Sequence, residues 1–287
     1  MTLAWRPDLD IAEQIRQKAR ELLESGSVVG VIGYERGTLG VARPFFALKP
    51  EETDRLIWDN TCHLNLVSFL NTRKGKKWAV VAKPCDSRAV NVLLHESQIK
   101  REEVYVIGVT CEGVQKNGQL ELRCQHCTQR VPVVYDFLAG EPPAVTATPD
   151  DFSDVTALSN KTPAERLAYW AAQFDRCLRC YACRQACPGC YCSECVADQL
   201  DPEWMSIAIN LPEKSFFHVM RAYHLAGRCV ECNSCEEVCP VNIPLSLLNR
   251  QLVREIATLF GDFRAGLDPT TEAPLATFRK DEAVGTR

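Results

Sequence analysis

One cysteine run occurs twice in this chain and limits what it can fold into. The run has the spacing C-x-x-C-x-x-C-x-x-x-C-P and covers residues 177–188 and 229–240. In paired runs of this kind, three cysteines hold one [4Fe-4S] cluster and the fourth, placed by the proline, binds the other cluster. The spacing therefore predicts two clusters: cluster 1 on Cys177, Cys180, Cys183 and Cys239, and cluster 2 on Cys229, Cys232, Cys235 and Cys187. Zinc is disfavoured because structural zinc sites rarely need four cysteines so close together.

The cysteine content indicates metal binding rather than disulfide bonds. A chain of 287 residues, 46% of them hydrophobic, can bury a core without covalent staples, yet it holds 16 cysteines. The first residues, MTLAWRPDLD, lack the basic and apolar regions of a signal peptide, and no segment approaches the about 20 apolar residues that span a bilayer. We therefore expect a cytoplasmic protein without a membrane span, in which reduced thiols spaced C-x-x-C bind metal.

Residues 1–140 alternate between strand and helix patterns, which predicts an α/β domain. Short apolar runs rich in β-branched residues are typical of buried strands, and they occur at 28–33, 78–82 and 104–109. Apolar residues at helical spacing predict helices at 10–23, 51–57, 62–71 and 86–96.

The rest of the chain has a different character. Residues 141–162 are rich in Pro, Thr, Ser and Asp, which indicates a linker. Residues 163–262 carry helical patterns and no convincing strand, so we expect an all-α domain with the cysteines between its helices. The tail, 263–287, is either without fixed structure or an arm that docks on a partner.

A third cysteine set lies in the first domain. Cys85 and Cys111 each follow a predicted strand, so both belong to the edge of the sheet where ligands of α/β proteins usually bind. Cys124 and Cys127 form a C-x-x-C pair that can close the site. Spacing alone leaves open a cluster on all four (cluster 3), a zinc site, or unrelated buried thiols.

Four further cysteines remain. The spacing C-x-C-x-x-C places Cys190, Cys192 and Cys195 within reach of one ion, with Cys62, a neighbouring group or a partner as the fourth ligand. A fourth [4Fe-4S] cluster and zinc are both open for this set, as is a role in packing without metal.

The cysteine runs resemble a known module. About forty residues separate them and include the helical patterns of WMSIAINL and SFFHVMRAYHLAG. This arrangement, over residues 165–260, resembles the α-helical two-cluster ferredoxin module of heterodisulfide reductase and of fumarate reductase iron–sulfur subunits.

The first domain resembles another family. The succession VVGVIGY, VARPFFALKPEE, WAVVAKPCDSRAV, the strand before Cys111, and CQHC is similar to the beta subunits of coenzyme F420 (deazaflavin) hydrogenases and related formate dehydrogenases, over 25–135. Members bind one [4Fe-4S] cluster beside an FAD. The matching positions are Lys83, Pro84, Cys85, Cys111, Cys124 and Cys127, so the resemblance implies cluster 3.

The resemblance also implies candidate flavin contacts. By family position, the loops with Asn60 and Thr61 and those with Lys83 and Arg88 would face the FAD, with solvated surface charges as the alternative. The sequence itself carries no dinucleotide fingerprint, because Gly30, Gly33 and Gly37 have the wrong spacing.

These features predict electron transfer rather than acid–base or nucleophilic catalysis, for which the sequence offers no motif. We expect an iron–sulfur, FAD-containing electron-transfer subunit of a cytoplasmic anaerobic oxidoreductase, with hydrogenase, formate dehydrogenase or heterodisulfide-reductase-like partners. The alternative is a wiring and docking subunit with [4Fe-4S] clusters and no flavin. A zinc-dependent regulatory or nucleic-acid module is disfavoured, because the net charge is -4 and no polybasic stripe occurs.

Overall fold

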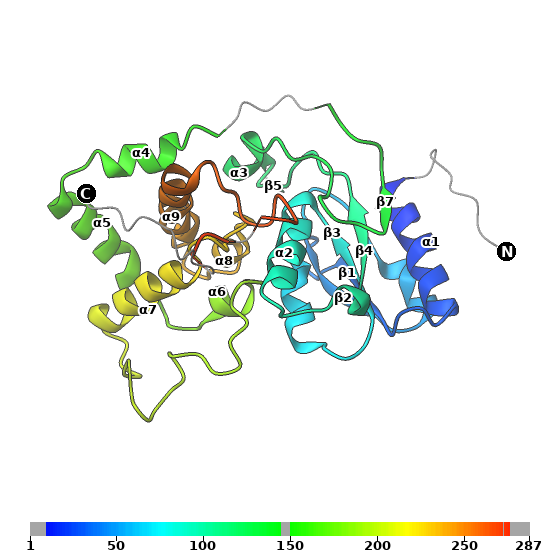
Figure 1. Cartoon of the computed structure of the whole chain (residues 1–287), viewed down its shortest axis with the longest axis horizontal. Helices are drawn as coiled ribbons and strands as arrows, with labels where there is room; N and C mark the ends of the chain where they lie inside the picture. The colour runs from blue at the N-terminus through cyan, green and yellow to red at the C-terminus, as the bar shows by residue number, and fades with distance from the viewer. Residues whose placement is uncertain (1–9, 145–149, 272, 276–287) are drawn as a thin grey trace.

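The structure is a computed structural model that describes residues 10–144, 150–271 and 273–275. A sheet-containing half and a helical half lie side by side, with the strands in the first half of the chain and helices α4 to α9 in the second (Figure 1). None of the helices among the described residues is long and apolar enough to cross a membrane.

A five-stranded sheet forms the centre of the first half, in the order β2-β1-β3-β4-β7. Strands β1, β3, β4 and β7 are parallel, and β2 pairs antiparallel with β1. The middle strands are apolar along almost their whole length because both of their faces are buried. The bounds are β1 Val31–Arg36, β2 Ala42–Ala47, β3 Trp78–Ala82, β4 Val104–Val109 and β7 Phe137–Ala139.

Helices pack on this sheet as the sequence predicts. Helix α1 (Ile11–Glu24) buries Ile15, Ala19 and Leu22, which recur at helical spacing. Helix α2 (Pro84–His95) begins at a proline directly after β3, where the missing N–H of proline costs no hydrogen bond. The α/β character expected for the first half is therefore confirmed.

Other details of the first half differ from the expectation. The helices expected at 51–57 and 62–71 are 3-10 helices, η1 (Pro50–Arg55) and η2 (Leu66–Thr72). Strands β2 and β7 were not predicted, because β2 has a proline in its middle and β7 has three residues. The smaller elements are η3 (Arg101–Glu103), β5 (Gln115–Lys116), β6 (Gln119–Leu120) and α3 (Leu122–Gln125).

From residue 150 onward, the described residues contain helices and one isolated β-bridge, between Leu200 and Glu203. Helix α7 packs against α5 and α9, and the short helices α6 and α8 occupy equivalent places in the two cysteine runs. The bounds are α4 Ser153–Ser159, α5 Pro163–Asp175, α6 Ala182–Gln185, α7 Leu211–His224, α8 Ser234–Glu237 and α9 Leu245–Phe260. That these helices form a two-cluster ferredoxin module stays a prediction.

The stretch expected to be a linker, 141–162, contains helix α4. This helix is held to α9 by Arg250, whose guanidinium lies 2.8 Å from carboxylate oxygens of both Asp150 and Asp154. Seven residues are too few to show a helical period in a sequence, so composition alone suggested a loop.

The segment after α9 turns back to the sheet half. Residues 262–271, the return segment, run along α2, where Arg88 Nε donates to the carbonyl oxygen of Ala265 at 2.9 Å and Asn91 Nδ2 to that of Gly266 at 3.0 Å. The approach at Gly266 is so close that a β-carbon there would lie 2.0 Å from the Arg88 carbonyl oxygen. The first part of the expected tail therefore docks on its own chain, while residues 272 and 276–287 lie outside the described residues.

Candidate metal centres

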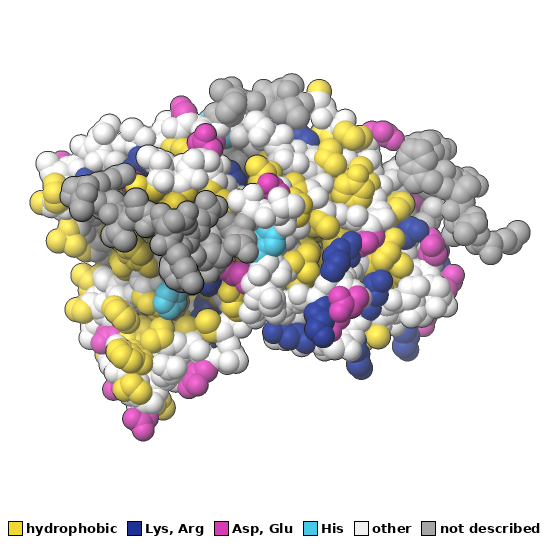
Figure 2. Space-filling view, viewed as in Figure 1, with side chains coloured by type: hydrophobic (Ala, Val, Ile, Leu, Met, Phe, Trp, Pro, Cys, Tyr) yellow, Lys and Arg dark blue, Asp and Glu magenta, His cyan; other side chains and the backbone are white. Residues whose placement is uncertain are grey.

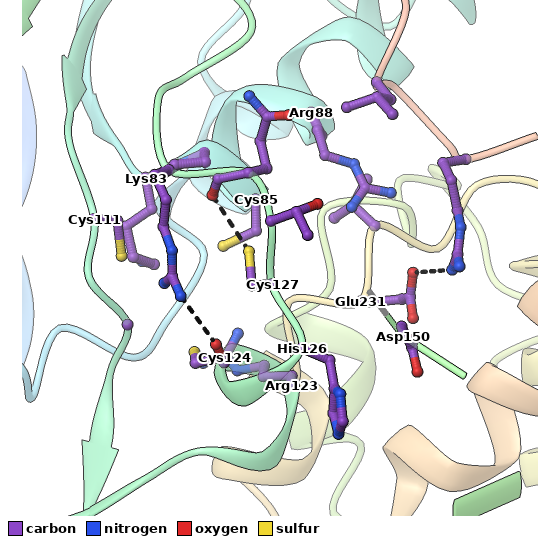
Figure 3. Close-up of a pocket in the computed structure, with 18 of the residues that line it drawn as sticks. Lys83, Cys85, Arg88, Cys111, Arg123, Cys124, His126, Cys127, Asp150 and Glu231 are labelled. Carbon is purple, nitrogen blue, oxygen red and sulfur yellow. Dashed lines mark hydrogen bonds and ion pairs between the residues drawn. The ribbon is translucent and has the colours of Figure 1, made fainter. Parts of the chain in front are cut away.

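The four cluster-3 cysteines line one cavity of about 250 Å³ between the two halves of the chain (Figure 3). Cys85 lies in the first turn of α2, after β3, and Cys111 lies directly after β4. Both therefore come from the carboxyl ends of parallel strands, the usual ligand-binding edge of such a sheet. Cys124 lies in α3 and Cys127 just beyond it, and both line the same cavity, with Cys127 next to Cys85 (Figure 3).

The surroundings of these thiols suit a metal. Burial raises the pKa of Cys85 and of Cys111, so without a metal both would stay protonated and neutral. Lys83 and Arg123 oppose this rise for Cys85, because their positive charges favour a thiolate. The Val114 N–H lies 3.5 Å from Cys124 Sγ, which also favours negative sulfur. A bound metal would complete the deprotonation.

Unpaired donors also face this cavity. Arg88 Nη2 and Arg123 Nε are buried and have no hydrogen-bond partner among the described residues, and both side chains line the cavity. Leaving a buried charged donor unpaired is costly, so this wall is suited to an anionic group. A [4Fe-4S] cluster with four thiolate ligands is such a group, and the residues present fit it.

Lys83, expected near a flavin, is engaged inside the protein. Its Nζ donates to the Tyr34 hydroxyl at 2.6 Å and to the Leu64 carbonyl at 2.8 Å, and lies 2.8 Å from Asp86 Oδ2. An ammonium group has three N–H donors, and all three are accounted for here. Its charge is therefore balanced within the protein.

Asn60 and Thr61 do not line the cluster-3 cavity. The Asn60 amide donates to Gln115 Oε1 at 3.0 Å, and the Thr61 hydroxyl donates to Asp59 Oδ1 at 2.5 Å. Of the four candidate flavin contacts, the structure thus brings Lys83 and Arg88 to the cavity and leaves the other two in a separate loop network.

The cysteines of the repeated run gather as the spacing predicts. One cavity is lined by Cys187, Cys229, Cys232 and Cys235, the set named cluster 2. Another is lined by Cys177, Cys180, Cys183 and Cys239, the set named cluster 1. Each set thus takes three cysteines from one run and the fourth from the other.

The two runs also share an unusual backbone. Arg179 and Tyr181 have φ of 52° and 58°, and their counterparts Glu231 and Asn233 have 60° and 56°. Left-handed conformations are rare for residues other than glycine and occur where the surroundings require them. In the first run, this turn lets the Arg179 N–H donate to Cys177 Sγ at 3.3 Å. The repeat seen in the sequence is therefore also a repeat of conformation that directs N–H groups at sulfur.

The sulfur spacing distinguishes between metals. Among the described residues, no three cysteine sulfurs lie within 4.8 Å of one another, and the one trio of potential ligands that close is His63, Glu121 and Glu237. Four thiolates around one zinc ion lie about 3.8 Å apart, since Zn–S bonds are about 2.3 Å long. In a [4Fe-4S] cluster each cysteine binds a different corner iron, so wider spacing is required. The observed spacing is wider than a single zinc ion requires.

The four surplus cysteines have separate surroundings. Cys62 is buried in the core of the sheet half, where burial raises its pKa to about 12. The side chain of Cys190 forms a hydrogen bond with that of Cys187, and the side chain of Cys195 forms one with that of Arg184. Cys192 is exposed. The structure does not bring these four together, and a further metal site on them stays a prediction.

Two residues of the sites were missed by sequence reasoning. Arg123 precedes Cys124 in α3, and Arg221 lies on the buried face of α7 beside the cluster-1 and cluster-2 cysteines. Arginine next to a C-x-x-C pair was a usable signal for the first. Nothing in the sequence marks the second, because its neighbours come from both cysteine runs.

Proteins similar to this chain are subunits of oxidoreductases. It is 24% identical to the F420-dependent formate dehydrogenase subunit beta of Methanocaldococcus jannaschii, over 65% of this chain and 73% of that protein. It is also 24% identical to the F420-dependent formate dehydrogenase 1 subunit beta of Methanococcus maripaludis, over 89% of this chain and 90% of that protein.

A shorter region, 33% of this chain and 20% of the other protein, is 31% identical to the cobalamin reductase PduS of Citrobacter freundii. No protein-family model matches the chain. The chain is thus related to redox-complex subunits. Its relationship to the beta subunits of formate dehydrogenases, expected from the cysteine and strand motifs, is confirmed.

Proposed function

We propose that this chain is an iron–sulfur electron-transfer subunit of a cytoplasmic anaerobic oxidoreductase, with three [4Fe-4S] clusters. The observation that carries the proposal is that three sets of four cysteines, each chosen from sequence spacing, line three separate cavities. Clusters supply one-electron chemistry, while the protein supplies thiolates, hydrogen bonds to sulfur and a dry surrounding.

Cluster 2 adjoins both of the other sites, which makes a row of three sites part of this proposal. Cys232 of cluster 2 and Cys85 of cluster 3 interact electrostatically across Arg123. Cys235 of cluster 2 and Cys183 of cluster 1 do so across Arg221. A row of sites suits a protein that conducts electrons between two surfaces.

The cluster-1 end of the row suits a partner subunit. Cys180 is exposed there. Arg179, which lies between two cluster-1 cysteines in the sequence, donates a hydrogen bond to the Ala208 carbonyl at 2.6 Å and so ties the loop before α7 to this site. Large apolar side chains on this surface are well exposed: Leu178 by 57%, Trp204 by 61%, Ile207 by 84% and Ile209 by 65%. Figure 2 shows hydrophobic side chains gathered over α7 and the loop before it. Exposed apolar patches of this kind mark interaction sites, so we place a hydrogenase-, formate-dehydrogenase- or heterodisulfide-reductase-like partner here.

The observations favour the flavin-free form of this function. The cavity that Lys83 and Arg88 line is also lined by the four cluster-3 cysteines. Lys83 is engaged within the protein, and Asn60 and Thr61 do not reach the cavity. Dependence on F420 is stated in the names of the relatives and is not part of this proposal.

Metal and flavin analysis of anaerobically purified protein tests this function. We expect about twelve irons and as many acid-labile sulfides per chain, since each cluster holds four of each. We expect no zinc, and no fluorescent flavin after the clusters are removed with acid. Stoichiometric zinc with little iron would overturn the proposal, and released flavin would overturn its flavin-free form. About sixteen irons would add a fourth cluster on the surplus cysteines.

A further inference from the structure

Two arginines are buried between neighbouring cysteine sites. Arg123, from α3, lines the cluster-3 cavity and donates through Nη1 to the backbone carbonyl of Cys232, a cluster-2 cysteine. Arg221, from α7, donates through Nη2 to the backbone carbonyl of Cys183, a cluster-1 cysteine, at 3.0 Å. Its guanidinium also interacts with the cluster-2 cysteines Cys187 and Cys235. Each arginine therefore contacts two adjacent sites.

Neither guanidinium forms an ion pair with a carboxylate among the described residues, although Glu121 acts on Arg123 more weakly than the cysteine sulfurs do. The buried charges that interact most strongly with Arg123 and Arg221 are cysteine sulfurs. In both side chains Nε is buried and has no hydrogen-bond partner among the described residues. An unpaired buried guanidinium costs several kcal/mol, so both positions require negative charge on the sulfur side.

Arg250 provides an internal comparison. It is also largely buried, but its guanidinium lies 2.8 Å from carboxylate oxygens of Asp150, Asp154 and Glu231. That arginine is compensated by ordinary ion pairs and holds α9 to α4. Arg250 also lines the cluster-2 and cluster-3 cavities, but its charge is met by carboxylates, whereas Arg123 and Arg221 have no such ion pairs.

We propose that Arg123 and Arg221 are positioning residues that raise the reduction potentials of the clusters between which they lie. Arg123 acts on clusters 2 and 3, and Arg221 on clusters 1 and 2. Each reduction adds one electron to a cluster and makes it more negative, so a fixed cation nearby stabilises the reduced form more than the oxidised form. The low dielectric of the buried sites strengthens the effect. This inference rests on the three-cluster function proposed above.

The arrangement predicts a pattern that a general structural role would not produce. Of these two arginines, cluster 2 lies near both, whereas clusters 1 and 3 each lie near one. Removing Arg123 should lower the reduction potentials of clusters 2 and 3, and removing Arg221 should lower those of clusters 1 and 2. Cluster 2 should therefore respond to both changes.

The test is a mediated redox titration of the anaerobic holoprotein, followed by electron paramagnetic resonance, for Arg123→Gln and Arg221→Gln. We expect the affected signals to shift by at least about tenfold in the one-electron reduction equilibrium, which is 59 mV. Arg123→Lys and Arg221→Lys keep the charge and should stay close to the wild-type potentials. Arg123→Met and Arg221→Met, which keep the apolar stem, repeat the test if a glutamine variant does not load.

Potentials equal to wild type in the neutral variants would overturn the inference. So would equal shifts of all three signals, or lysine variants that shift as far as the glutamine variants. The iron content of the wild-type protein separates this failure from that of the proposed function. Fewer than three clusters in wild type refutes the function, whereas three clusters without the pattern refutes only the roles of Arg123 and Arg221.

Discussion

Lys83 and Asp86 form an ion pair of 2.8 Å in which both side chains are almost completely buried, with 1% and 0% of their surface exposed. The pair joins the residue after β3 to the first turn of α2, the turn that also carries Cys85. Breaking one side of a buried pair leaves the other charge uncompensated, which is more damaging than removing both.

Lys83→Met should therefore lower the free energy of unfolding by about 3–5 kcal/mol, because Asp86, whose pKa burial already raises, would be left without its cation and would have to take up a proton. The double variant Lys83→Met, Asp86→Leu should recover part of this loss. Anaerobic denaturant unfolding of the three proteins measures both effects. If Lys83→Met had the same free energy of unfolding as wild type, the ion pair would not contribute to stability as we expect.

Gly266→Ala should detach the return segment from α2, because the added β-carbon would lie 2.0 Å from a backbone oxygen that cannot move freely. Gly261→Ala is the matched control: this glycine also has positive φ, 76°, but nothing lies within 4 Å of its β-carbon position. The strain of the left-handed backbone is common to both variants, about 1 kcal/mol. Limited proteolysis should cut 262–271 much faster in Gly266→Ala alone, and equal rates in the two variants would count against tight docking.

In the proposed pairing, the fourth cysteine of each run binds the cluster held by the other run. Replacing that cysteine should therefore remove the cluster of the other run. Cys239→Ser should remove cluster 1, although the other three cluster-1 cysteines belong to the first run, and Cys187→Ser should remove cluster 2. Each variant should lose about four irons, one cluster. Cys192→Ser, at an exposed position, should keep them all. Iron analysis and electron paramagnetic resonance spectra measure these losses. The pairing would be refuted if Cys239→Ser removed cluster 2 or Cys187→Ser removed cluster 1.

Arg250→Met should weaken the contact between α4 and α9, because Asp150, Asp154 and Glu231 would then lose the cation that they share, with Arg264 left to pair with Glu231. We expect a loss of about 3 kcal/mol in unfolding free energy. Arg254→Met, on the same helix with a partly exposed side chain, should cost well below 1 kcal/mol. Thermal unfolding compares the two, and similar losses would show that the Arg250 network contributes little.

The sequence predicted the features of the fold that a short local pattern of residues determines. The apolar runs at β3 and β4 showed buried parallel strands, and the two cysteine runs contained the partner sets that line the observed cavities. It did not predict the environment of residues whose contacts come from distant parts of the chain. The ammonium of Lys83 is engaged by Tyr34 and Leu64, and Arg221 meets cysteines of both runs, so neither environment can be recognised from neighbouring residues.

The cavity around the cluster-3 cysteines has walls from both halves of the chain. The four cysteines that line it all come from the sheet half, while Val230, Glu231, Arg264 and Leu267 cover it from the helical half. A cluster built there before the halves meet would be open to water and oxygen on that side. Maturation of this protein should therefore follow an order, in which the third cluster becomes durable only after the helical half has folded and its return segment has closed over the site.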